Sequence, residues 1–184
     1  MKTSLKRKTT LGRTETVRPF TSSRLRPGRG FRIVVTTMED VMTVTVAPAT
    51  PGDLPAVLTL LRTVGLPTEG VEDHIGTFVV AREGTRIVAC GGAEAHAFVA
   101  LIRSVAVSPE YQRHGLGRRI VRELLDRLAS HGLREFYLLT TTAEEFFKKR
   151  GFRVIDRDEV HPQLLGSSEF QGACPDSATC MRLV

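Results

Sequence analysis

The 184-residue sequence contains no tryptophan, only two tyrosines and only three cysteines. An odd number of cysteines does not suggest a disulfide framework, so we expect a reducing compartment such as the cytoplasm. No apolar run approaches the roughly 20 residues that a membrane-spanning helix needs, which argues against an integral membrane protein. The length and the 41% hydrophobic content are instead sufficient for one globular domain with its own core.

Net positive charge is absent outside the first 41 residues, although the whole chain has a formal net charge of +6. Residues 1–41 hold ten of the 26 basic residues and three of the 20 acidic ones, so residues 42–184 keep 16 basic and 17 acidic groups. A surface that binds nucleic acid needs clustered basic residues. The nearly neutral remainder therefore predicts no nucleic-acid partner.

Residues 1–41 are rich in Thr, Ser, Arg and Gly and show no sustained periodicity. This composition cannot bury a core and predicts a disordered basic leader. Two interpretations stay open. The leader lacks the apolar segment of a secretory signal and is faintly similar to a transit peptide, or it is an over-long start, since "MTVTVAPATPGDLP" from Met42 looks like a natural beginning. We expect the folded domain over residues 42–184.

The apolar periodicity of residues 42–184 predicts alternating strands and helices in a single α/β domain. The expected strands are 43–47, 77–83, 86–96, 98–107, 135–141, 152–156 and 178–184, and the expected helices are 51–64, 66–76, 115–131 and 143–150. The strand at 98–107 has the longest apolar run and is expected to be the most central. Residues 159–170 are expected to form a helix or a loop.

A glycine-bearing turn, Gln112–Gly117, joins the strand at 98–107 to the helix at 115–131. Successive N–H groups in such a turn and the positive end of the helix dipole favour an anion. Glycines would let a phosphate approach the backbone closely, and Arg113 and Arg118 could reinforce the site. The spacing matches neither a dinucleotide-binding fold nor a P-loop. A helix start with incidental glycines is the alternative.

The segment "VAVSPEYQRHGLGRRIV" resembles the [QR]-x-x-G-x-[GA] segment of the GNAT superfamily of acetyl-CoA-dependent N-acetyltransferases. "TTTAEEFFKKRGF" resembles the short helix and Gly-Phe pair that follow in that family. The likeness runs from about Val44 to Val184. Within the superfamily, the chain is similar to acetyltransferases found beside arsenic-resistance genes and to the acetyltransferase domain of N-acetylglutamate synthase.

The resemblance implies a GNAT-like, mixed but mostly antiparallel central sheet flanked by helices, and acetyl-CoA as cosubstrate, with no metal. Pantetheine would lie where the strand at 100–107 diverges from the strand at 136–140. The amine would attack the thioester directly in a ternary complex. The residues expected to bind acetyl-CoA are Val105, Ala106, Val107, Gln112, Arg113, His114, Gly115, Leu116, Gly117, Arg118 and Phe147.

Glu94 is the candidate general base, because an acid on an otherwise apolar strand is unexpected at a buried face. His96 lies on the same strand face and could extend a proton relay. In the alternative, residues 94–96 have already left the sheet and are solvated. Phe147 stands where many members of the family have a tyrosine as general acid, and Tyr137, Ser104 or water could replace that group.

Arg103 is the single charge inside the central strand. Its guanidinium could clamp a substrate carboxylate or pair with a structural acid. Ser104, Thr140 and Thr141 are further candidate substrate contacts, with Thr140 where many members of the family have Asn. Cys90 is expected to be a packed core thiol. Cys174 and Cys180 invite an arsenic-binding hypothesis, against which ordinary structural cysteines are the alternative.

These observations predict an N-acetyltransferase acting on a small amine, namely an α-amino acid or a glutamate-like compound, an arsenic-containing one included. The alternatives are acetylation of a protein N-terminus or lysine, or a non-catalytic acetyl-CoA-binding module. The expected partner is a small-molecule amine, with no nucleic acid and no membrane, and a homodimer is compatible with the sequence.

Overall fold

The computed structural model describes residues 44–184, and the prediction for residues 1–41 lies outside them. The strands are β1 (Val44–Pro48), β2 (Val79–Glu83), β3 (Arg86–His96), β4 (Val99–Val107), β5 (Glu135–Thr140), β6 (Phe152–Val154) and β7 (Thr179–Leu183). The α-helices are α1 (Leu54–Thr63), α2 (Val71–His74), α3 (Leu116–Ser130) and α4 (Glu144–Lys148). The predicted elements are confirmed in order and type, but the helix predicted over 66–76 is shortened to α2 and a 3-10 turn at Ile75–Thr77, since Pro67 and Gly70, with φ +72°, precede it. The segment at 159–170 holds short 3-10 turns and leads into a π-helical turn, Glu169–Ala173.

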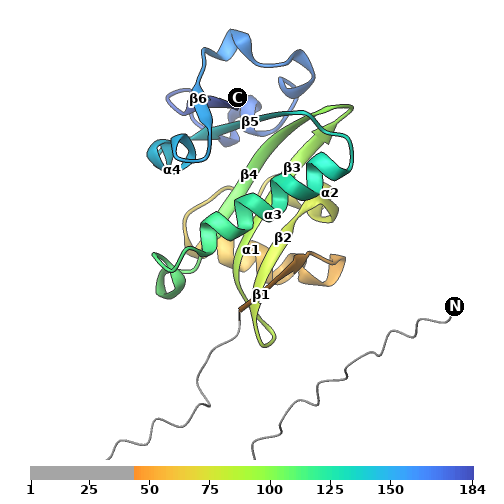
Figure 1. The fold of residues 1–184 in the computed structure, drawn as a ribbon, viewed down its shortest axis with the longest axis vertical. Coiled ribbons are helices and arrows are strands. Elements are labelled where there is room, and N and C mark those ends of the chain that lie inside the picture. Colours follow the sequence, from red (N-terminus) through yellow and green to blue (C-terminus); the bar gives the residue numbers. More distant parts are fainter. Residues whose placement is uncertain (1–43) are drawn as a thin grey trace, which may run out of the picture. The chain divides into compact units, whose positions relative to one another are not determined.

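The strands of the described residues form one sheet in the order β1-β2-β3-β4-β5-β7-β6 (Figure 1). Only β4 and β5 pair in parallel, and the other neighbours are antiparallel. The predicted mixed, mostly antiparallel sheet is therefore confirmed, and β4 lies at its centre. The last strand, β7, inserts between β5 and β6, which brings the chain segment before β7 close to the end of β5.

The two faces of the sheet are covered by different helices. On β2, Val79 and Ala81 join the apolar cluster that contains Ile120 and Leu124 of α3. Val80 points the other way and packs in the cluster that contains Leu61 of α1. This alternation follows from the two-residue period of a strand. The sheet is therefore buried between α3 on one face and α1 on the other.

A β-bulge in β4 ends its pairing with β5. Where β3 pairs with β4, Cys90 lies opposite Ala106 and Gly92 lies opposite Arg103. One residue of β3 and two residues of β4 therefore lie between these pairs, so β4 holds one extra residue. Ser104 within the bulge has φ +56°, a left-handed conformation that is uncommon for a residue with a side chain. The parallel pairing of β4 with β5 stops at Ile102 and Leu138. The second half of β4 is thus left without a partner on that side, as the predicted divergence requires.

The start of α1 is held by one carboxylate. The Asp53 side chain accepts hydrogen bonds from the Thr50 backbone N–H at 2.7 Å and the Thr50 hydroxyl at 2.8 Å. It also accepts two hydrogen bonds from the Arg82 guanidinium of β2, at 2.7 and 2.6 Å. The Arg82 hydrogen bonds, more than any other contact, hold the pKa of Asp53 well below its ordinary value. Asp53 therefore caps the start of this helical segment, and its carboxylate also links α1 to the sheet.

The substitution Asp53→Asn is expected to lower the free energy of unfolding by about 1–2 kcal/mol at pH 7, because it removes the ion pair with Arg82 and weakens the cap. Since the pKa of Asp53 is depressed in the folded state, its contribution is complete above the pKa of the unfolded chain, about 4. It is lost as the pH falls toward the folded-state pKa. Urea denaturation of both proteins should therefore show a difference that shrinks below about pH 4. A difference that is constant down to pH 2 would contradict this explanation.

Candidate active site

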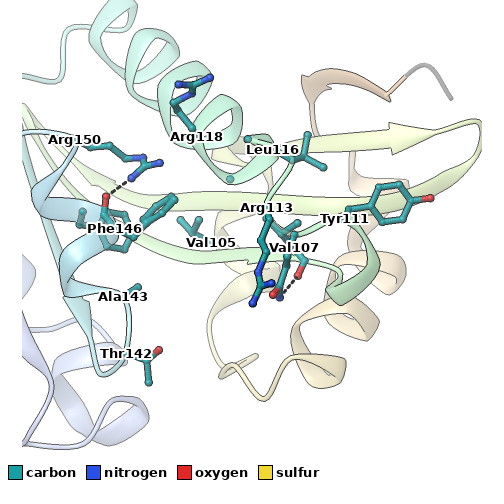
Figure 2. Close-up of a pocket in the computed structure, with 14 residues that line it drawn as sticks. Val105, Val107, Tyr111, Arg113, Leu116, Arg118, Thr142, Ala143, Phe146 and Arg150 are labelled. Carbon is teal, nitrogen blue, oxygen red and sulfur yellow. Dashed lines mark hydrogen bonds between the residues drawn. The ribbon is translucent and has the colours of Figure 1, made fainter. Parts of the chain in front are cut away.

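A cavity of about 600 Å³ lies between the start of α3 and α4, with Val105 and Val107 of β4 along it (Figure 2). Its lining residues are Val105, Val107, Tyr111, Gln112, Arg113, Gly115, Leu116, Gly117, Arg118, Thr142, Ala143, Phe146, Phe147 and Arg150. The cavity therefore includes the unpaired part of β4 and the glycine-bearing turn that the sequence singled out.

The turn before α3 has the backbone geometry of an anion site. Arg113 and Gly115 both have positive φ, at +66° and +78°, and Gly115 is the N-cap of the helix. Alternating left-handed residues orient successive N–H groups toward one side. The first N–H groups of α3 have no acceptor within the helix, and its dipole places partial positive charge there. A Cβ on Gly117 would contact the Phe146 ring at 3.4 Å, so a larger side chain there would occupy part of the cavity.

Three arginines, Arg113, Arg118 and Arg150, are the charged residues that line this cavity within the described part of the chain. The Arg150 guanidinium lies over the Phe146 ring, 3.3 Å from its centroid, and donates to the Phe146 carbonyl. Its Nε is buried without a hydrogen-bond partner among the described residues. Burial, and then the nearby Arg118 charge, lower the pKa of Arg150. An anion in this cavity would give the buried Arg150 Nε–H an acceptor and would reduce the repulsion between Arg118 and Arg150.

A second cavity of about 400 Å³ adjoins the first, since Val105, Thr142, Ala143 and Phe147 line both. Its lining residues are Gly65, Leu66, Pro67, Ile102, Arg103, Ser104, Val105, Leu138, Leu139, Thr140, Thr141, Thr142, Ala143, Phe147, Glu169, Ala173, Cys174 and Pro175. The two cavities meet at Val105, beside the bulge where β4 separates from β5. A molecule bound in the first cavity could thus present one end to a molecule in the second.

Phe147 lies where the two cavities meet and carries no hydroxyl that could protonate a leaving group. Its ring contacts Phe146 and Phe152 edge to face, at centroid distances of 5.0 and 5.5 Å. Of the predicted replacements for a tyrosine, Ser104 lines the second cavity, whereas Tyr137 does not. The Tyr137 hydroxyl donates to Glu135 at 2.7 Å, and burial raises its pKa to about 12. Ser104 or water is therefore left as the candidate proton donor.

Glu94 is buried within β3, so the alternative that residues 94–96 leave the sheet is wrong. One carboxylate oxygen accepts a hydrogen bond from Arg103, and the other lies 3.9 Å from Nε2 of His74. Glu94 does not line either cavity. The assignment of Glu94 as general base stays a prediction, and this geometry places Arg103 between Glu94 and the second cavity. Nε2 of His96 is buried without a partner among the described residues, which leaves the predicted relay through His96 a prediction as well.

Arg103 is paired with two buried acids, and pairing with an acid was one of the two interpretations of its role. Its side chain is 1% exposed, and it holds Glu94 of β3 and Glu169 of the π-helical turn, the latter at 2.9 Å. Glu169 also accepts a hydrogen bond from the Cys174 thiol at 2.6 Å. Burial and this contact raise the pKa of Cys174 to about 12, so it stays a thiol at neutral pH.

Most of the residues predicted from the sequence line one of the two cavities. The exceptions are Ala106, which is buried with the α1 cluster, His114, and Glu94. The site residues predicted from the sequence did not include Tyr111, Phe146 and Arg150 of the first cavity or Glu169 and Cys174 of the second. The first three lie within the two segments that resemble the GNAT superfamily, so the sequence held a signal for them. Cys180 packs with Tyr137 and Leu164 in a core cluster.

Over residues 44–184, no three or more His, Cys, Asp or Glu side chains are placed to hold a metal ion. Over the same residues, no helix has the length and apolar character needed to cross a membrane.

Comparison with known proteins gives a family match and several relatives. The family described as "Acetyltransferase (GNAT) family" matches residues 52–152. An amino-acid acetyltransferase of Neisseria meningitidis is 29% identical over 126 residues, which cover 64% of this chain and 29% of the relative. An uncharacterised N-acetyltransferase of Chlorobaculum tepidum is 32% identical over 96 residues, which cover 52% of this chain and 61% of the relative. The chain spans less than a third of the length of the amino-acid acetyltransferases that it matches.

Two solved structures show the same fold. N-acetylglutamate synthase from Neisseria gonorrhoeae, complexed with coenzyme A and N-acetylglutamate, aligns with a TM-score of 0.66 and 24% identity, over 77% of this chain and 35% of that one. A Mycobacterium tuberculosis protein in complex with CoA and NLQ aligns with a TM-score of 0.65 and 26% identity, over 76% of this chain and 98% of that one.

Proposed function

Because the chain belongs to the acetyltransferase (GNAT) family, we propose that it transfers the acetyl group of acetyl-CoA to the amino group of an amino acid. The observation that carries this proposal is the meeting of two cavities at Val105, one lined by cations and helix N–H groups and the other holding a carboxylate. The first suits a nucleotide-bearing thioester and the second suits an amine. The acetyl group could then pass directly from the thioester to the amine, without first being attached to a side chain of the protein.

The first cavity is the proposed acetyl-CoA site. Its residues fit the cosubstrate, because the N–H groups at the start of α3 and the three arginines complement a pyrophosphate. Beyond Ile102, β4 has no strand partner on this side, so the backbone of Val105 and Val107 could offer hydrogen bonds to the amides of pantetheine. The Val107 carbonyl accepts one from the Gln112 side chain at 3.2 Å, which pantetheine would replace. Bound there, acetyl-CoA would supply the activated acetyl group at the junction of the cavities. Structures similar to this one contain coenzyme A, which supports the assignment.

The second cavity is the proposed acceptor site. The hydroxyl groups of Ser104, Thr140 and Thr141 line it and could bind the carboxylate of an amino acid. Arg103 was predicted as a clamp for that carboxylate, but its ion pairs with Glu94 and Glu169 favour a structural role. Similarity to amino-acid acetyltransferases supports an amino acid as acceptor. A glutamate-like compound or an arsenic-containing analogue belongs to the same proposed class.

Two other functions stay as alternatives. A protein N-terminus or lysine could serve as acceptor, and the phenylalanine at position 147 in place of tyrosine is compatible with a module that binds acetyl-CoA without transferring it. The predicted cytoplasmic location and homodimer stay predictions.

The proposal is tested by incubating the protein with acetyl-CoA and a panel of single acceptors, following the release of CoA thiol. The panel holds glutamate, other amino acids, an arsenic-containing amino acid, a peptide with a free N-terminus and one with an internal lysine. Sustained turnover with one or more amino acids, above the rate without acceptor, is expected. Turnover with the peptides alone would replace the proposed acceptor, and no turnover despite binding of acetyl-CoA would favour the non-catalytic module.

A further inference from the structure

Glu169, from the chain segment before β7, is the one carboxylate among the described residues that line the acceptor cavity. Its side chain is 9% exposed, in a turn that begins where Ser167 accepts a hydrogen bond from the Glu169 backbone N–H at 3.1 Å. One carboxylate oxygen pairs with Arg103 and the other accepts from Cys174. A carboxylate has about four lone-pair positions, so both oxygens can accept a further donor from the cavity.

Arg103, the other charged residue of this cavity, has a partner on each nitrogen. Nη1 donates to Glu94 and to the Ser168 hydroxyl at 3.3 Å, and Nε lies 3.5 Å from the Ser104 hydroxyl. Nη2 donates to the Glu69 carbonyl and pairs with Glu169 at 2.9 Å. The Arg103 guanidinium therefore has no nitrogen without a partner to offer a bound acceptor molecule, whereas the Glu169 carboxylate can still accept a hydrogen bond from it. The cavity is suited to bind an ammonium group rather than to clamp a carboxylate with Arg103.

The charge of the cluster favours the same ligand. Two buried carboxylates, Glu94 and Glu169, share one guanidinium. Glu94 has His74 as a second neighbour, 3.9 Å away at a partly exposed position. Glu169 has only the neutral Cys174 thiol as its second neighbour. An acceptor ammonium at Glu169 would supply the missing positive charge on the cavity side.

We propose that Glu169 binds the ammonium group of the acceptor and takes its proton, and that Arg103 is the positioning residue that fixes the Glu169 carboxylate. This inference rests on the proposed function. Its consequence is that the acceptor site is completed by the segment before β7, beyond the residues matched by the family, and that the base comes from this segment and not from β3.

The proton balance of the step is simple. The acceptor ammonium gives one proton to the Glu169 carboxylate, which leaves a nitrogen lone pair able to attack. The nitrogen attacks the thioester carbonyl carbon, a C–N bond forms and the C–S bond breaks, with its electron pair leaving on sulfur. The second nitrogen proton goes to that thiolate through Ser104 or water. Glu169 returns its proton to solvent, and the overall products are an N-acetyl amino acid, CoA thiol and one proton.

The test compares Glu169→Gln with Glu94→Gln, using the acceptor that turns over fastest with the wild-type chain. Glutamine keeps the shape of Glu169 and its contact with Arg103 but cannot take a proton. We expect kcat/KM for the acceptor to fall about 10²- to 10⁴-fold at pH 7. The loss should shrink with rising pH as the amine deprotonates on its own. The acetyl-CoA dissociation constant should change less than about threefold.

Controls separate catalysis from folding. Glu159→Gln alters an exposed carboxylate before the same segment and should retain wild-type kinetics. Glu169→Asp keeps a carboxylate and should keep the wild-type pH profile at a reduced rate. If Glu169→Gln does not fold, Glu169→Asp carries the test, and a changed pH profile in that variant contradicts the proposal.

The remaining outcomes separate an error in the assignment of Glu169 from an error in the proposed function. A wild-type rate for Glu169→Gln, a loss that does not depend on pH, or a pH-dependent loss in Glu94→Gln alone overturns the assignment of Glu169. Each of these leaves the proposed function standing, because the wild-type chain still transfers acetyl groups. A wild-type chain that binds acetyl-CoA and transfers to no amine contradicts the proposed function, and with it this inference.

Discussion

The substitution Arg103→Met is expected to lower the free energy of unfolding by about 3–5 kcal/mol, because it leaves two buried carboxylates without their shared cation. Glu94 and Glu169 are 4% and 9% exposed at the side chain, so water compensates little for the lost guanidinium. Chemical denaturation monitored by circular dichroism measures the change. Arg86→Met, which removes an exposed ion pair with Glu110, is the matched control and should unfold almost like the wild type.

The cause of this loss can be tested separately. Adding Glu94→Gln and Glu169→Gln to Arg103→Met removes the uncompensated charges and should recover part of the stability. If Arg103→Met alone unfolds like the wild type, then Arg103 does not hold the cluster together. If the triple variant is no more stable than Arg103→Met, the destabilisation comes from lost packing rather than from charge.

The substitution Gly115→Val is expected to weaken acetyl-CoA binding by about 10- to 100-fold, equivalent to one hydrogen bond from the backbone to a charged group. Gly115 is the N-cap of α3 with φ +78°, a conformation that a β-branched residue strongly disfavours. Relaxation of that strain would turn the N–H groups of the turn away from the first cavity. Calorimetric titration with acetyl-CoA measures the loss.

Gly132→Val provides a matched control at the other end of α3. Gly132 also has a positive φ, +89°, and no atom within 4 Å of an added Cβ. Both variants should therefore lose a similar amount of stability, about 1–2 kcal/mol. Only Gly115→Val should lose affinity. Equal affinities in the two variants would show that the turn does not bind the pyrophosphate through its backbone.

Local patterns predicted the fold, and they singled out most of the residues that line the first cavity. The longest apolar run, at residues 98–107, predicted the central strand β4. The glycine-bearing turn after β4 is likewise made of residues adjacent in the chain, and most of them line the first cavity. Such features depend on short-range geometry, which a single sequence contains.

The acceptor side depends on contacts between residues far apart in the chain. Glu169 contacts Arg103 because β7 inserts between β5 and β6. No local pattern around Glu169 predicts that contact. Glu94 was recognised as an unusual buried acid, yet its partner, Arg103, could only be named from the pairing of β3 with β4. The sequence thus marks Glu94 and Arg103 as unusual side chains, but only the fold shows that they pair with each other and that Arg103 also pairs with Glu169.

The proposed reaction forms a bond between an acetyl carbon and the nitrogen of an amino acid. NMR can follow this bond in a reaction containing the protein, acetyl-CoA labelled with ¹³C at the carbonyl, and the best amino-acid acceptor labelled with ¹⁵N. We expect a carbon–nitrogen coupling that grows at the same rate as free CoA thiol. Loss of the thioester signal to acetate, with no carbon–nitrogen coupling, would contradict it.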